Sequence, residues 1–138
     1  MADQRTYNNF LEIFQSLNDK DKKILDKFIE VKFFPAGIPL TAEGNPADGI
    51  YIIKSGSIDV TVGKEKKKIS KLQKGELFGE ISFIFDLPQT ATLYTAENSE
   101  LMYIKKENYE LLKKKNPDTA LKMTIDLAKI LYFRLIKQ

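Results

Sequence analysis

The chain has 138 residues, of which 43% are hydrophobic and 30% charged, and its net charge is +3 at pH 7. These values are typical of one globular domain with a single core, and the small positive charge is well short of the concentrated basic surface of a nucleic-acid-binding protein. Cysteine and histidine are both absent, which excludes zinc sites with thiolate or imidazole ligands and nucleophile pairs of the Ser-His or Cys-His type.

Residues 6–30 predict two helices. Asn18 and Asp19 are good capping residues for the second helix. In both halves the apolar residues recur at helical spacing and form one stripe: Tyr7, Phe10, Leu11, Phe14 and Leu17 in the first, and Ile24, Leu25, Phe28 and Ile29 in the second. Each helix is therefore expected to bury one face.

The pattern then changes to that of short strands separated by turns. Residues 50–53 are all apolar, which is typical of a fully buried strand. In residues 57–62 the apolar Ile58, Val60 and Val62 alternate with polar residues, which predicts a half-buried strand with a polar outer face. Turn signals recur roughly every 8 to 12 residues with no helical segment between strands, and this favours a small antiparallel barrel or sandwich.

Helical spacing returns near the C-terminal end. Residues 108–114 predict a short helix, and Asn116-Pro117 places a capping residue before a proline at the first helical position. From Pro117 to Gln138 we expect one helix of about 20 residues, roughly 30 Å long.

Two short motifs stand between the predicted strands. The first is Phe78-Gly79-Glu80-Ile81-Ser82, and the second is Pro88-Gln89-Thr90-Ala91-Thr92. A glycine-carboxylate turn followed by a small, hydroxyl-rich turn can bind a ribose phosphate. The spacing of the two motifs resembles the phosphate-binding cassette of the cyclic nucleotide-binding domain family.

The resemblance covers nearly the whole chain. It rests on positions that are weak one by one and strong in this order: Gly37, Gly44, Tyr51, Gly56, Gly75, Phe78-Gly79-Glu80, Ala91-Thr92 and Asn116-Pro117. It implies a mainly β fold with flanking helices, an antiparallel β-roll of the double-stranded β-helix, jelly-roll-like type. Residues 1–138 would form a single domain, with N-terminal helices in 1–33, the β-roll in 34–106 and C-terminal helices, one of them long, in 107–138.

The resemblance also implies roles for the cassette residues. The carboxylate of Glu80 would accept a hydrogen bond from the ribose 2′-hydroxyl, and Gly79 would let the backbone approach the sugar. Backbone amides near Gln89, Thr90 and Ala91 would point at the phosphate, and the Thr90 hydroxyl would add a donor. The implied binding set is therefore Phe78, Gly79, Glu80, Ile81, Ser82, Gln89, Thr90 and Ala91, and the implied ligand is cyclic AMP or cyclic GMP.

The chain departs from the family at Gln89, where the family normally has an arginine that forms a forked ion pair with the phosphate. A hydrogen bond to a charged group contributes about 1.5–3 kcal/mol, so this difference alone predicts roughly 10- to 150-fold weaker binding. A cation from Lys74, Lys129 or Arg134 would restore it. Two interpretations stay open: a sensor that binds a cyclic nucleotide, and a pseudo-sensor with a degenerate cassette, which the affinity argument favours.

The sequence of the last helix predicts a contact with a second chain. Between Leu127 and Ile136 the apolar residues surround almost the whole circumference, and a belt of this kind must be buried on several sides. In the family this helix packs against its symmetry mate. We expect a twofold homodimer through residues 120–138, with Leu127, Leu131 and Leu135 in the contact; the alternative is a helix folded wholly against its own chain.

The remaining expectations concern class and location. We expect a non-catalytic regulatory module of signal transduction, because no pair of acids suggests a carboxylate enzyme and no catalytic or metal-binding residues stand out. A protein effector is a possible partner, whereas a DNA-binding domain and a membrane are not expected; the lysine clusters, such as Lys66-Lys67-Lys68, are interpreted as solvated. The lack of an apolar leader and of cysteine predicts a cytoplasmic protein.

Overall fold

The computed structural model describes residues 14–46 and 48–136, apart from the side chains of residues 81, 82 and 135. The first predicted helix lies mostly outside the described residues. Among the helices that are described, none is long and apolar enough to cross a membrane. The chain divides into two compact units, a β unit of Glu30–Lys106 and a helical unit formed by the segments before and after it.

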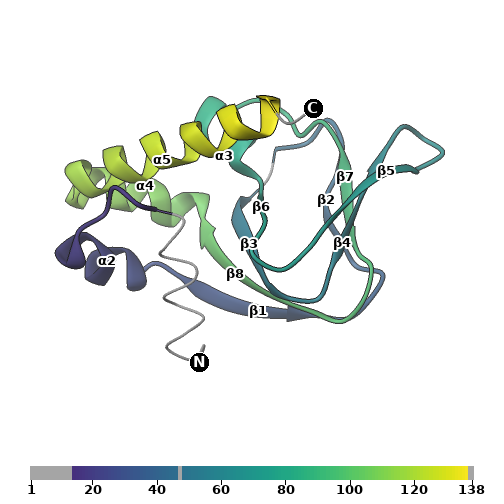
Figure 1. The fold of residues 1–138 in the computed structure, drawn as a ribbon, viewed down its shortest axis with the longest axis horizontal. Coiled ribbons are helices and arrows are strands. Elements are labelled where there is room, and N and C mark those ends of the chain that lie inside the picture. The colour runs from purple at the N-terminus through teal and green to yellow at the C-terminus, as the bar shows by residue number, and fades with distance from the viewer. Residues whose placement is uncertain (1–13, 47, 137–138) are drawn as a thin grey trace. The chain divides into compact units, whose positions relative to one another are not determined.

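The β unit consists of two antiparallel four-stranded sheets (Figure 1). This confirms the predicted mainly β, antiparallel roll. One sheet has the order β1-β8-β3-β6 and the other β2-β7-β4-β5. The strands are β1 (Glu30–Phe34), β2 (Pro39–Thr41), β3 (Gly49–Ser55), β4 (Ile58–Val62), β5 (Lys67–Leu72), β6 (Leu77–Phe78), β7 (Thr92–Thr95) and β8 (Ser99–Lys105).

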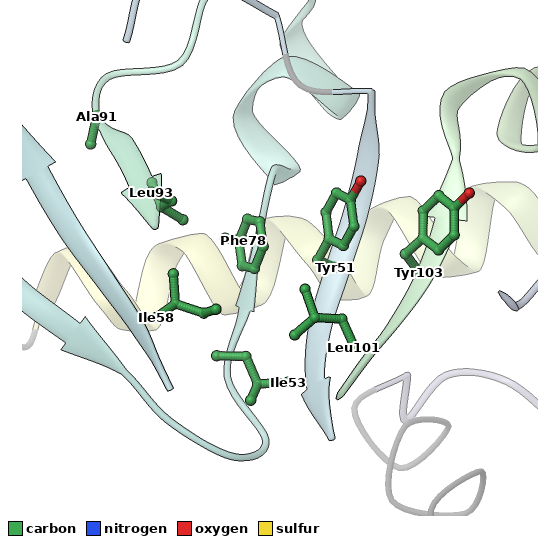
Figure 2. Packing of buried hydrophobic residues seen from close by; sticks show 8 residues of the cluster. All are labelled: Tyr51, Ile53, Ile58, Phe78, Ala91, Leu93, Leu101 and Tyr103. Atoms are coloured by element: carbon green, nitrogen blue, oxygen red, sulfur yellow. The ribbon is translucent and has the colours of Figure 1, made fainter. Parts of the chain in front are cut away.

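The β unit has a core to which both sheets contribute. Its central feature is an aromatic stack across neighbouring strands (Figure 2), in which the ring of Tyr51 lies 4.9 Å from that of Phe78 and 5.1 Å from that of Tyr103. The Nζ atom of Lys32 lies 4.3 Å from the centre of the Tyr103 ring. Offset stacking of this kind adds to the free energy gained from burying the rings. The rest of the buried cluster consists of Ile53, Ile58, Ala91, Leu93 and Leu101.

Strand β3 confirms the prediction from its apolar sequence, because residues 49–53 are all buried. Strand β4 differs from its prediction. Asp59 and Thr61, expected on a solvated face, are only 8% and 4% exposed. The reason is that lysines of β5 cover this face: Lys68 Nζ lies 3.1 Å from Asp59 Oδ2, and Lys71 Nζ lies 3.7 Å from Oδ1.

Two further features differ from the sequence expectation, one boundary and one additional helix. Strand β1 begins at Glu30, inside the stretch 1–33 assigned to helices, because its backbone pairs with β8 from Glu30↔Tyr103 to Phe34↔Ser99. A short helix, α3 (Glu80–Phe85), lies between β6 and β7, where no helix was predicted. It occupies the first motif of the cassette.

The described part of the helical unit contains α2 (Asp19–Asp26), α4 (Lys106–Lys115) and α5 (Pro117–Ile136). The predicted cap of α2 is confirmed as a reciprocal capping box: Asp21 N donates to Asn18 Oδ1 over 2.8 Å, and Asn18 N donates to Asp21 Oδ2 over 3.1 Å. The predicted helix from Pro117 is confirmed over 20 residues.

Helix α5 is tied to the N-terminal segment by two buried carboxylates. Asp126 accepts hydrogen bonds from the backbone and hydroxyl of Ser16, at 2.9 and 2.7 Å. Asp21 accepts from Thr119 Oγ1 at 2.6 Å and from Lys122 Nζ at 2.8 Å. Burial alone would raise the pKa of Asp21, but the bonds from Lys122, Thr119 and Asn18 outweigh it and lower that pKa to about 2. The carboxylate therefore stays ionised at neutral pH and fixes the helix pair.

The apolar residues of α5 divide into buried and exposed sets. Leu127, expected at a contact with a second chain, is fully buried, and Leu131 is half-buried. The Leu135 side chain lies outside the described part. The exposed large residues are Leu121, Ile125, Tyr132, Phe133 and Ile136. Leu127 is therefore not presented to a second chain, because its own chain already covers it.

Candidate functional site

The two motifs of the cassette meet in the core of the β unit. Phe78 ends β6 in one sheet, and Ala91 directly precedes β7 in the other. Both side chains belong to the same buried cluster (Figure 2), with Phe78 4% and Ala91 8% exposed. The segment between them, which holds α3 and residues 86–90, is therefore anchored at both ends, one in each sheet.

The first motif makes an abrupt change from strand to helix at Gly79. This residue has a φ of +94°, a left-handed conformation that side chains other than glycine rarely adopt. Helix α3 starts at the next residue, Glu80, and Phe83 N donates to Gly79 O over 3.2 Å to close its first turn. This turn holds Glu80 in the interior, where the residue is only 4% exposed.

The second motif is held by backbone bonds to a distant turn. Gln89 N donates to Asn45 O over 2.9 Å, and Gly44 N donates to Gln89 O over 2.9 Å. The side chain of Gln89 is buried with the rest of the residue, which is 8% exposed. The sequence did not reveal residues 43–46 as the support of Gln89, because pairing between remote turns leaves no periodic signal.

The other predicted binding residues differ in their exposure. Thr90 is exposed, whereas the backbone oxygen of the buried Ala91 accepts from Thr41 Oγ1 over 3.5 Å. Ile81 and Ser82 lie in α3, and their side chains are outside the described part. The structure thus places all eight predicted residues in one connection between the sheets. It buries the two on which the sequence argument depends, Glu80 and Gln89.

The sequence suggested three residues that could supply a positive charge to the phosphate. Lys74 is exposed in the turn before β6, while Lys129 and Arg134 belong to the helical unit, with Lys129 exposed. Close to the cassette, Tyr51 donates its hydroxyl to Asp48 Oδ1 over 2.8 Å, and burial together with this carboxylate raises the pKa of Tyr51. The stacked phenol is therefore neutral at physiological pH.

No group of three or more acidic side chains in the described residues is arranged to hold a metal ion. What the cassette offers chemically is a buried carboxylate, a buried neutral amide and a glycine turn. These groups can accept hydrogen bonds from a small polar ligand and donate hydrogen bonds to it. The residue at position 89 contributes no positive charge.

Known proteins resemble this chain in sequence. The model of the cyclic nucleotide-binding domain matches residues 31–116. A cGMP-dependent protein kinase of Toxoplasma gondii is 30% identical over 106 residues, which are 77% of this chain and 10% of the kinase. A cAMP-dependent protein kinase regulatory subunit of Candida albicans is 29% identical over 109 residues, 77% of this chain and 24% of the subunit. The chain thus spans between a tenth and a quarter of these relatives.

Solved structures share the fold. A cyclic nucleotide-binding domain from Methylobacillus flagellatus superposes with a TM-score of 0.83 at 20% identity, covering 96% of this chain and 80% of that one. The catabolite activator protein of Thermus thermophilus gives a TM-score of 0.73 at 23% identity, covering 91% of this chain and 58% of that one. Together with the match over residues 31–116, these likenesses show that the chain belongs to the cyclic nucleotide-binding domain family.

Proposed function

We propose that this chain is a non-catalytic regulatory module whose affinity for cyclic nucleotides is weak or lost, and that it acts through dimerisation or protein partners. The observation that carries the proposal is the pair of buried side chains in the cassette, Glu80 and Gln89. By resemblance to the family, Gln89 stands where an arginine pairs with the phosphate. Its amide offers a donor and no charge.

Binding of a cyclic nucleotide in the cassette would bury a negative charge. A cyclic nucleotide would bring its anionic phosphate into a site that already holds the carboxylate of Glu80. Burying the phosphate without a paired opposite charge is costly. The lost charge-assisted bond weakens binding by roughly 10- to 150-fold relative to a domain with arginine at this position.

A second candidate function is a signalling domain that binds cyclic AMP or cyclic GMP through a phosphate site without arginine. It is favoured by the retained cassette, in which Gly79 keeps its left-handed turn and Glu80 is buried at the start of α3. The names of the related kinases and regulatory subunits also favour it. In this case a positively charged side chain at another position neutralises the phosphate.

Ligand-dependent thermal stabilisation separates the two candidates. A domain that binds cyclic AMP gains about 2.7 kcal/mol of stability when the ligand is present at 100 times its dissociation constant. We expect no shift of the melting temperature at micromolar cyclic AMP or cyclic GMP. A saturable rise with either ligand in this range would favour the signalling domain instead.

The proposed dimer uses the exposed face of α5. Leu121, Ile125, Tyr132, Phe133 and Ile136 are between 45% and 61% exposed, and they lie on one helix. An apolar surface of this extent is costly in water and is commonly covered in an isologous dimer. The contact is therefore expected through this set, with half-buried Leu131 at its border.

Light scattering with a matched pair of variants tests the dimer. The native chain is expected to have the mass of a dimer at tens of micromolar, and Ile125→Asp is expected to shift it to the monomer by placing a charge in the contact. Ile69→Asp is the control, because Ile69 on β5 is similarly exposed, at 56% against 45%. A native monomer, or an equal effect of both variants, would remove the proposal.

A further inference from the structure

The outer face of the second sheet holds a hollow that the cassette does not use. Its volume is about 550 Å³, and it lies over β4, β5 and β7. The hairpin of β4 and β5 is visible at the edge of the β unit (Figure 1). The residues that matter for its chemistry are Gly37, Asp59, Thr61, Lys66, Lys68 and Tyr94.

A buried carboxylate forms the floor of this hollow. Asp59 is 8% exposed, and its Oδ1 accepts no hydrogen bond from any residue in the described part of the chain. Lys71 Nζ is 3.7 Å from this atom, too far for a hydrogen bond, while Lys68 Nζ approaches the other oxygen to 3.1 Å. Buried carboxylate oxygens normally accept hydrogen bonds. Oδ1 is therefore an unsatisfied acceptor beneath the lysines, and a donor from outside reaches it only when the lysine side chains turn outward.

Local backbone distortions place the lysines around this carboxylate. The register of β4 and β5 shifts by one residue between Val60↔Ser70 and Thr61↔Lys68, which makes a β-bulge beside the hollow. Bulges re-aim side chains and are over-represented beside binding sites. In the turn before β5, Lys66 has a φ of +55°, and its Nζ lies 5.0 Å from the centre of the Tyr94 ring.

The charged residues around the hollow indicate which kind of ligand it can bind. Lys66 and Lys68 line the hollow and Lys71 lies 3.7 Å from its one carboxylate, so the hollow attracts anions, while Asp59 Oδ1 lacks an N–H or O–H donor. A peptide with acidic side chains supplies both, because backbone N–H groups alternate with its carboxylates. A DNA backbone supplies phosphates without donors, and Asp59 would repel it.

We propose that this hollow binds an acidic peptide segment of a partner protein. The lysine side chains turn outward to pair with the carboxylates of the segment, and this uncovers Asp59, which accepts a hydrogen bond from the backbone of the segment. The site lies on the sheet β2-β7-β4-β5 and depends neither on Glu80 nor on Gln89. It is independent of whether a cyclic nucleotide binds.

The test uses the full chain and a fluorescein-labelled peptide in which glutamate alternates with serine, followed by fluorescence anisotropy at low salt. Lys66→Gln combined with Lys68→Gln is expected to weaken binding by about tenfold or more, the effect of losing charge-assisted bonds. Lys114→Gln combined with Lys115→Gln removes the same charge from exposed positions on α4 and is expected to change binding by no more than about twofold. Amide shifts in NMR are expected at Asp59, Lys68 and Tyr94.

Asp59→Ala distinguishes a specific binding site from nonspecific electrostatic attraction. The change raises the net charge of the chain, so bulk electrostatics predicts tighter binding of the peptide. The proposed site predicts weaker binding, because the acceptor is lost and Lys68 loses its ion pair. Circular dichroism checks the fold of this variant, and the two lysine variants decide the matter if it does not fold.

Several results would overturn the proposal. These are no binding of the peptide by the native chain, equal losses in the two lysine variants, or tighter binding by folded Asp59→Ala. Binding of a DNA duplex or anionic vesicles that depends on Lys66 and Lys68, with none of the peptide, would also contradict it.

Discussion

Gln89→Arg is expected to bind cyclic AMP or cyclic GMP roughly 10- to 150-fold more tightly than the native chain, because it restores a charge-assisted, forked pair with the phosphate. The position of residue 89 is already set by its backbone. The backbone of Gln89 is already fixed by its two hydrogen bonds to Gly44 and Asn45, and these do not involve the side chain. Isothermal titration calorimetry of both proteins measures the ratio.

Gln73→Arg is the matched control for this gain. It adds the same positive charge to the β unit, but at an exposed position in the turn before β6. We expect it to change cyclic nucleotide affinity by no more than about twofold, as exposed charges do. If the two variants gain equally, the effect is general attraction of the anion. If neither gains, position 89 does not face the phosphate and the account of the cassette is wrong.

Gly56→Ala is expected to be the most destabilising of the single changes considered for the β unit. Gly56 has a φ of +94°, and a Cβ there would lie 2.7 Å from both the backbone oxygen of Asn98 and the Cα of Ser99. The left-handed conformation costs a residue with a Cβ about 1–2 kcal/mol, and forcing the backbone of residues 98 and 99 aside adds about 1–3 kcal/mol. Urea denaturation is expected to show a loss of about 2–5 kcal/mol in the free energy of unfolding.

Gly63→Ala separates the two contributions. Gly63 has a φ of +78°, also left-handed, but a Cβ at this position meets nothing within 4 Å. Only the conformational cost of about 1–2 kcal/mol is expected there. Equal losses in the two variants would mean that the close approach of Gly56 to Asn98 and Ser99 relaxes without cost.

The sequence predicted those parts of the fold that depend on local signals. The apolar run at residues 50–53 became β3, and Asn18 capped α2 through a box with Asp21, because strand burial and capping are read from adjacent residues. Pro117 began α5 for the same reason. The sharp turn of the first motif was also foreseeable from Gly79, which has a left-handed conformation. The binding role of the cassette residues stays a prediction.

The sequence did not predict what depends on remote neighbours. Helix α3 has six residues, too few to form without tertiary support, so periodicity could not reveal it. Alternation in β4 identified two faces, but only β5 determines that Asp59 is covered by lysines rather than by water. The apolar belt of α5 indicated several buried sides without saying that Leu127 belongs to the side covered by its own chain.

Calorimetric titration of the native chain with cyclic AMP and cyclic GMP tests the central claim most directly, namely that a buried glutamine cannot replace an arginine opposite a phosphate. We predict dissociation constants well above about 1 μM, the value that corresponds to about −8.2 kcal/mol of binding free energy. A dissociation constant of about 1 μM or lower for either nucleotide, at one site per chain, would contradict the account.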